Sequence, residues 1–268
     1  MYAMGLSKVV RLSLAMVWVA LLGTISQPKV FAGDAGIIEP RATELLKKMS
    51  DYLASLKQFS VRGTTTMEYV LKNGQKIEFT STSDVFVQRP NRVRANRVGD
   101  VADVEFYYDG ANVSLFGKKQ QYYATAPAPP TVDAMLDDIR TRLGMEPPGA
   151  DLLYSDVYNG LMADVTEAHY ITPSVVGGTK THHLAFRGKD VDFQIWIEDG
   201  DRPLPRKYVI VTKGTQGEPE FGVELSNWNV SPRLDVAMFK FTPPANATKV
   251  DFLPPKEIAA AARDAQRK

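Results

Sequence analysis

The sequence has 268 residues, with 32 lysines and arginines against 31 aspartates and glutamates, 44% hydrophobic residues and no cysteine. These proportions are those of an ordinary globular protein and exclude a disordered or collagen-like chain. Without cysteine there is no disulfide, thiolate metal site, iron–sulfur cluster or cysteine nucleophile. The balanced charge leaves no basic footprint for nucleic acid, so we expect no nucleic-acid partner.

The first 32 residues have the pattern of a secretory signal. Lys8 and Arg11 precede an apolar run at 12–22, and Ala32 ends a short segment with small residues at the positions that a signal peptidase reads. A membrane anchor is the alternative, but the run is shorter than the roughly 20 residues needed to cross a bilayer. We therefore expect cleavage after Ala32 and a periplasmic protein that does not span the membrane. The predicted parts are a signal at 1–32, one domain at 33–255 and a C-terminal tail at 256–268.

Residues 39–56 have the pattern of an amphipathic helix. Their apolar residues recur at three- and four-residue spacing, and Pro40 suits the first helical turn. The apolar stripe consists of Ala42, Leu45, Leu46, Met49, Tyr52, Leu53 and Leu56. Another part of the chain must cover this stripe.

From residue 58 onward the apolar residues alternate with polar ones, as in β-strands with one buried face. Asn73-Gly74 predicts a tight hairpin, and Asp109-Gly110 and Asp199-Gly200 predict two more. Gly177-Gly178 has the wrong spacing for a phosphate loop and also predicts a hairpin. These signals indicate an antiparallel sheet with one apolar face.

Residues 124–161 interrupt the strand pattern. A helix is predicted at 132–143, between prolines on both sides and followed by Gly144. A second short helix is predicted at 151–162, after which strands resume.

The predicted fold class is α+β. One long helix and two short ones cannot cover both faces of roughly ten strands, so we expect a strongly curved antiparallel sheet that forms an open half-barrel. The N-terminal helix and an inserted helical lid would cover it. Whether the interior is filled by side chains or holds a ligand stays open, because both need the same alternation.

Three segments carry a resemblance to a known family. Residues 84–91 (Asp-Val-Phe-Val-Gln-Arg-Pro-Asn), the strand end Tyr108-Asp109-Gly110 and residues 236–244 resemble, in the same order, landmarks of the periplasmic lipoprotein carriers LolA and LolB. Residues 151–153 and 202–207 resemble more closely an uncharacterised family of predicted periplasmic proteins in the same superfamily. The resemblance implies an open β-barrel closed by helices, with an apolar cavity for acyl chains.

The resemblance also implies a role for Arg89, which matches the carriers' arginine that helps to hold the helical lid shut. Arg89 shares strand parity with Val85 and Val87 and should point to the concave side. A guanidinium there needs acceptors, and the carbonyls at the end of a lid helix would serve. The alternative is an arginine at the barrel rim that forms a fixed salt bridge or reaches water.

No catalytic or metal site is predicted. His182 and His183 are adjacent on a strand and point to opposite faces, so they are poorly placed to share a metal. Acids such as Asp133 and Asp137 are stabilised early in a helix by its dipole and need no catalytic explanation. Motifs for a serine nucleophile, a P-loop or a dinucleotide are missing. We expect no cofactor and no enzymatic activity.

The predicted function is that of a periplasmic binding protein for a lipid, an acylated peptide or another hydrophobic molecule. The predicted ligand-lining residues are Leu45, Met49, Met67, Phe79, Val85, Val87, Met135 and Ile139, with Arg89 as the latch of the lid. The alternative is an envelope sensor or protein-interaction module whose barrel is filled and whose surface binds an envelope protein.

Overall fold

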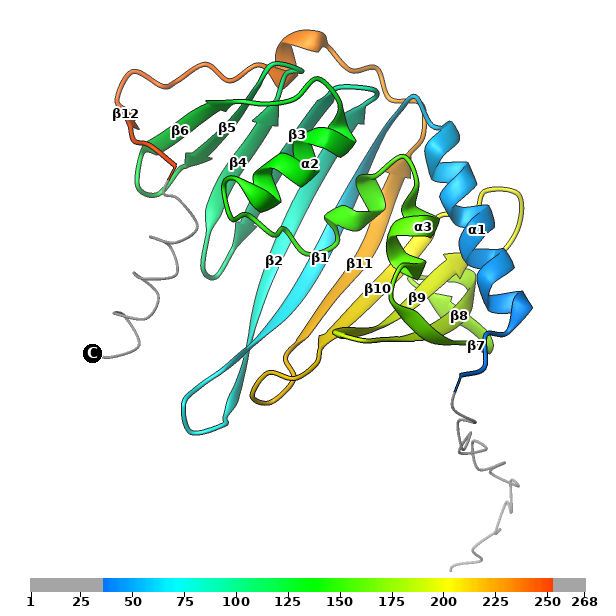
Figure 1. The fold of residues 1–268 in the computed structure, drawn as a ribbon. Helices are drawn as coiled ribbons and strands as arrows, with labels where there is room; N and C mark the ends of the chain where they lie inside the picture. Colours follow the sequence, from blue (N-terminus) through cyan, green and yellow to red (C-terminus); the bar gives the residue numbers. More distant parts are fainter. Residues whose placement is uncertain (1–35, 253–268) are drawn as a thin grey trace, which may run out of the picture. The chain divides into compact units, whose positions relative to one another are not determined.

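Twelve strands form a single sheet, and α-helices cover one of its faces in the computed structural model, which describes residues 36–252 (Figure 1). The predicted signal at 1–32 and the predicted tail at 256–268 lie outside the described residues. All described residues belong to one compact unit. Within them, no helix combines the length and the apolar character needed to cross a membrane.

Helix α1, Pro40–Ser55, confirms the predicted amphipathic helix. Pro40 stands in the first turn, where its missing N–H costs no hydrogen bond. The Glu39 carboxylate before the helix accepts a hydrogen bond from the Tyr170 backbone N–H at 2.9 Å, which joins the start of α1 to the sheet. The helix buries Ala42, Leu46, Met49, Ser50 and Leu53.

The first half of the sheet is a meander of six strands. They are β1 (Gln58–Val70), β2 (Lys76–Gln88), β3 (Arg92–Gly99), β4 (Asp103–Tyr108), β5 (Asn112–Gly117) and β6 (Tyr122–Pro127). Each pairs antiparallel with the next. The predicted hairpin at Asn73-Gly74 is confirmed, and Gly74 has the positive φ of +85° that a side chain would disfavour.

The second half is a meander of five strands that returns to the first strand. They are β7 (Val165–Val176), β8 (Thr179–Gly188), β9 (Val191–Glu198), β10 (Pro205–Thr212) and β11 (Glu220–Asn229). The Gly177-Gly178 turn joins β7 to β8, as predicted. Strand β11 pairs with β1, so that the two halves meet at the centre of the sheet.

The segment between the two halves, residues 128–164, is called the insert below. It contains α2 (Val132–Thr141), the 3-10 helix η1 (Ala150–Leu153) and α3 (Val157–Met162). The prediction of one continuous helix at 151–162 was wrong. Tyr154 is extended with ψ of 156°, and the Asp156 side chain caps a new helix by accepting from the Asn159 N–H at 3.0 Å.

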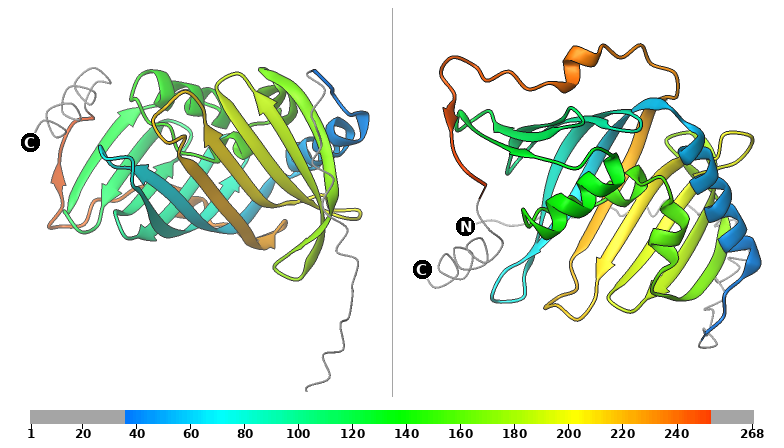
Figure 2. Two further views of the ribbon diagram at one scale, coloured as in Figure 1. Left: turned by 90° about the horizontal axis from the view of Figure 1, so that it is seen from below. Right: turned by 45° about the horizontal axis from the view of Figure 1, so that its top comes forward.

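The C-terminal part of the described chain crosses the end of the sheet from β11 to β6 (Figures 1 and 2). It contains the 3-10 helix η2 (Val236–Phe239) and the short strand β12 (Thr248–Lys249), which pairs parallel with β6. Phe241 of this segment contacts the rings of Tyr107, Phe116 and Tyr123, with centroid distances of 5.3 to 5.8 Å.

The sheet is curved and open, with α1 and the insert on its concave side (Figure 2). Its order is β12-β6-β5-β4-β3-β2-β1-β11-β10-β9-β8-β7, so β12 and β7 are separate edges. The sheet therefore has more strands than predicted, because the C-terminal segment adds β12 and the second meander is complete. The helices pack on the apolar concave face, as one hydrophobic cluster of buried residues from both layers.

Candidate functional site

Four of the predicted lining residues meet beneath the helices. Met49 of α1, Val87 of β2 and Met135 and Ile139 of α2 are each at most 2% exposed and belong to the same hydrophobic cluster. The sequence pattern therefore identified the correct apolar faces of three segments that lie far apart in the chain. In this conformation the helices and the sheet are in direct contact at these residues.

Two further predicted residues, Leu45 and Val85, lie at the edge of this cluster. Both are half-buried and pack against its buried members. They extend the apolar surface beyond the fully buried centre.

The last two, Met67 and Phe79, are cross-strand neighbours farther along the β1–β2 hairpin. They are half-buried and are not among the residues packed against the hydrophobic cluster. They lie on the same face of the sheet as Val87. Phe79 and Val87 are eight residues apart on β2, however, which corresponds to about 26 Å along the strand. Alternation predicts the face of a residue and says nothing about its distance along the strand.

Polar and small side chains occupy the concave face between these two groups. Thr65 pairs with Ser81 across β1 and β2 on this face, and their hydroxyl oxygens are in hydrogen-bond contact. Arg97 of β3 donates from Nε to the Ser81 hydroxyl at 3.1 Å. Sequence reasoning did not single out these residues, although Ser81 and Ser83 stand on the apolar parity of β2 and interrupt its hydrophobic run.

Arg89 follows β2 and reaches the insert. Its Nη2 donates to the carbonyl oxygen of Tyr154, the residue directly after η1, at 3.1 Å. The carbonyl of Pro90, which follows Arg89, accepts a hydrogen bond from the Val132 N–H at 2.8 Å. The guanidinium thus lies on the concave side and binds a carbonyl of the insert. Burial lowers the pKa of Arg89, and the nearby carboxylate of Asp133 opposes this effect.

The acidic residues of α2 hold the insert together. The Asp133 carboxylate accepts hydrogen bonds from the Ser155 N–H and hydroxyl. Asp137 accepts from the Tyr154 hydroxyl at 2.7 Å, and burial together with this bond raises the pKa of Tyr154 to about 12. Each acid therefore has a structural partner, and α2 and the following turn form one cross-linked piece.

The insert is joined to the sheet and to α1 by hydrogen bonds and by buried apolar residues. Besides the contacts of Arg89 and Pro90, the Tyr108 hydroxyl donates to the Pro129 carbonyl, and the Tyr158 N–H donates to the Ser50 hydroxyl of α1 at 2.9 Å. The apolar underside of the insert consists of Val132, Met135, Leu136, Ile139, Leu143, Leu152 and Val157. The insert is therefore held together by its own hydrogen bonds, and its apolar side packs against the rest of the protein.

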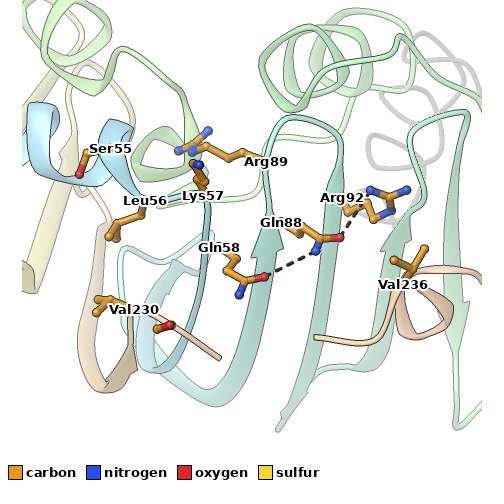
Figure 3. A pocket seen from close by; sticks show the side chains of 10 residues that line it. Ser55, Leu56, Lys57, Gln58, Gln88, Arg89, Arg92, Val230 and Val236 are labelled. Carbon is orange, nitrogen blue, oxygen red and sulfur yellow. Dashed lines mark hydrogen bonds between the residues drawn. The ribbon is translucent and has the colours of Figure 1, made fainter. Parts of the chain in front are cut away.

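A pocket of about 690 Å³ lies at the end of the sheet where β1 begins and β2 ends (Figure 3). Its lining residues are Ser55, Leu56, Lys57, Gln58, Gln88, Arg89, Arg92, Val230, Ser231 and Val236. They come from the end of α1, from the ends of three strands and from the C-terminal segment, so the pocket exists only in the folded chain. Gln58 and Gln88 contact each other through their amides at 3.5 Å on its wall.

The histidines have separate partners. His182 contacts the Asp199 carboxylate at 3.1 Å and the Tyr170 hydroxyl at 3.2 Å. His183 contacts Gln194 at 2.9 Å and stacks on Trp196, and burial lowers the pKa of this histidine. Residues 36–252 contain no group of three or more histidine, aspartate or glutamate side chains placed to hold a metal.

The chain was compared with known proteins. Among solved structures, it is similar to the lipoprotein LppX of Mycobacterium tuberculosis, with 16% identity over 74% of this chain and 100% of that one and a TM-score of 0.48. LprF of Mycobacterium bovis is 15% identical over 80% of this chain and 100% of that one, with a TM-score of 0.45. A LolA superfamily protein of Nitrosomonas europaea is 9% identical over 75% of this chain and 97% of that one, with a TM-score of 0.35.

The search of curated proteins found no match. A family model described as "Predicted periplasmic protein (DUF2092)" matches residues 42–253, which is almost the whole of the described chain. The prediction of an uncharacterised periplasmic family is confirmed, and the chain belongs to the DUF2092 family of predicted periplasmic proteins.

Proposed function

We propose that this protein is a periplasmic, non-enzymatic binding protein that holds a lipid, an acylated peptide or another hydrophobic molecule between its curved sheet and its helices. The observation that carries the proposal is the insert, a braced helical cover on an apolar concave face. Displacement of the cover would expose the side chains on its underside and on the sheet beneath it, and an apolar ligand would replace the contacts that are lost.

Two features of the insert support a movable cover. Its internal polar links, such as Asp133 with Ser155, would move with it as one piece. Its bond to Arg89 involves a single carbonyl and would break on opening. In this proposal Arg89 is the latch, and Leu45, Met49, Val85, Val87, Met135 and Ile139 line the opened site. Met67 and Phe79 would be reached only by a long ligand that extends toward the tip of the β1–β2 hairpin.

The first test is native mass spectrometry of the mature protein purified from its own envelope, followed by denaturation to release any bound molecule. We expect a hydrophobic molecule of reproducible mass. An empty protein that also fails to bind a fluorescent acyl probe would contradict the proposal. Recovery of a stoichiometric protein partner by the empty protein would favour the sensor or interaction module instead.

A second test compares the two faces of one strand. Val85→Asn places an amide on the concave face of β2, next to the cluster, and Phe86→Asn is the control on the opposite face. We expect the affinity for the acyl probe to fall about tenfold in Val85→Asn, because a polar group would face the ligand without a partner, and to be unchanged in Phe86→Asn. Equal affinities in both variants would place the ligand elsewhere.

A further inference from the structure

The pocket at the end of β1 and β2 is lined by positive charge. Lys57, Arg89 and Arg92 are all among its lining residues, and the lining contains neither aspartate nor glutamate. Lys57 follows α1, while Arg89 and Arg92 flank the turn between β2 and β3. The three residues line the same pocket because α1 ends beside the end of β2, where the Arg89 N–H donates to the Lys57 carbonyl at 2.8 Å.

These three cations lack the carboxylate partners that some of the other basic residues have. Arg62, Arg142 and Arg206 each form an ion pair with a carboxylate. Within residues 36–252, no carboxylate oxygen lies within ion-pair distance of Lys57, Arg89 or Arg92. Arg92 reaches only the side-chain oxygens of Gln88 and Asn91, both at 3.4 Å.

Arg89 also has unused hydrogen-bonding capacity. Its Nη2 binds the Tyr154 carbonyl, but its Nε is buried and has no acceptor within the described part of the chain. A buried donor without an acceptor costs free energy that an incoming oxygen ligand would recover. Asp133 attracts Arg89 from a distance but is not part of the pocket wall.

The remaining wall is suited to an amphiphile. Leu56, Val230 and Val236 supply apolar surface, and Gln58 and Gln88 supply amide groups (Figure 3). Leu56 and Val230 also contact the hydrophobic cluster under the helices. A molecule with an anionic group and an apolar chain would therefore find its charge and its chain matched on adjoining surfaces.

We propose that this pocket binds the anionic group, a phosphate or a carboxylate, at the head of the hydrophobic ligand. The inference rests on the proposed function and narrows the ligand to an anionic amphiphile. Bidentate bonds from a guanidinium to anionic oxygens are stronger than a single bond to a neutral carbonyl. The bound head group would compete with Tyr154 for Arg89, so that recognition of the head would help to release the insert.

The test uses dodecyl phosphate, dodecanol and inorganic phosphate as probes, each titrated calorimetrically into the mature protein. The pocket variant is Lys57→Gln/Arg92→Gln, which leaves the latch intact. The control variant, Lys72→Gln/Lys76→Gln, removes the same charge at the tip of the β1–β2 hairpin. We expect the dissociation constant of dodecyl phosphate to rise at least tenfold in the pocket variant only, with dodecanol binding equal in all three proteins.

The remaining outcomes are distinct. Dodecanol and dodecyl phosphate binding equally to all three proteins would overturn the head-group assignment and leave the proposed function standing. Inorganic phosphate binding as tightly as dodecyl phosphate would show a site for free phosphate and overturn the assignment as well. Failure of both amphiphiles to bind the unmodified protein would overturn the proposed function itself. Lys57→Arg/Arg92→Lys keeps both charges and should keep the affinity, and a loss of affinity in this variant would contradict the charge argument.

Discussion

At the scale of single residues, Arg89 takes part in two features of the structure. Its guanidinium binds a carbonyl of the insert and also lines a pocket of positive charge. Arg89 forms no ion pair within the described residues, so of the rim alternative only an arginine that reaches water stays open. An arginine with an exchangeable carbonyl partner is suited to a contact that forms and breaks.

Replacement of Arg89 by glutamine should loosen the insert. A hydrogen bond from a charged donor contributes about 1.5–3 kcal/mol, so amides of α2, η1 and α3 should exchange hydrogen at least about tenfold faster in Arg89→Gln. Hydrogen exchange followed by mass spectrometry measures this change. The control is Arg62→Gln, which removes an exposed ion pair between Arg62 of β1 and Asp84 of β2. It should leave hydrogen exchange in the insert unchanged.

Two methionines with the same predicted role should differ in their contribution to stability. Met49 is fully buried in the hydrophobic cluster, so Met49→Ala should lower the free energy of unfolding by about 2–5 kcal/mol. Met67 is half-buried outside that cluster, and Met67→Ala should cost clearly less, about 1 kcal/mol. Urea denaturation of both variants gives the comparison, and equal losses would show that the hairpin belongs to the same core.

At the scale of elements, the end of α2 is held by a charged pair. Arg142 donates from Nε to Asp138 at 2.8 Å and also binds the Pro127 carbonyl at 2.7 Å. The hydrogen bond from Arg142 lowers the pKa of Asp138 below its ordinary 3.8, and partial burial opposes this. The pair thereby links the last turn of α2 to the end of β6.

This pair predicts a specific pH dependence. Because the pKa of Asp138 is lower in the folded than in the unfolded chain, its stabilising contribution is present above pH 3.8 and is lost as the pH falls through the folded value. Asp138→Asn should therefore be less stable than the unmodified protein at pH 7, and the difference should become smaller as the pH is lowered further and further below 3.8. Urea denaturation over a series of pH values from 7 downward tests this, and a constant difference would contradict it.

At the scale of the whole molecule, the C-terminal segment ties the end of one half of the sheet to the other. It leaves β11 at the centre and ends as β12 at the edge, and Phe241 fastens it to the aromatic side chains of Tyr107, Phe116 and Tyr123. Arg94 also donates to the Met238 carbonyl at 3.4 Å. The rings of Tyr107 on β4 and Tyr123 on β6 therefore pack against the C-terminal segment of the chain itself.

Removal of the Phe241 ring should release this segment. Phe241 is half-buried, so Phe241→Ala should lower the free energy of unfolding by about 1–3 kcal/mol, less than for a fully buried ring. Limited proteolysis should then cut between residues 232 and 250 sooner than in the unmodified protein. Val250→Ala, at an exposed position of the same segment, is the control and should change neither measurement. Unchanged proteolysis of Phe241→Ala would show that the other contacts of the segment hold it without the Phe241 ring.

The family followed from the resemblance of short segments to known proteins, and the general architecture followed from local patterns. Helix α1, helix α2 and the alternating strands were predictable because the direction of a side chain repeats every 3.6 residues in a helix and every two in a strand. The hairpins at Gly74 and Gly178 were predictable because few residues accept a positive φ. The same local rules identified Met49, Val87, Met135 and Ile139 as residues that face inward, and inward is where the structure has them.

Other features depend on contacts between distant segments, which no local pattern encodes. The break between η1 and α3 was missed because the Asp156 cap competes with a helix that the apolar spacing alone would continue. The position of Met67 and Phe79 outside the hydrophobic cluster was not predictable, because parity carries no information about distance along a strand. Lys57, Arg89 and Arg92 line one pocket because the pairing of β1 with β2 brings the end of β2 beside the end of α1, and the C-terminal segment adds Val230 and Val236 to the wall. Periodicity is a local property of the chain, whereas a pocket depends on which distant segments the tertiary structure brings side by side.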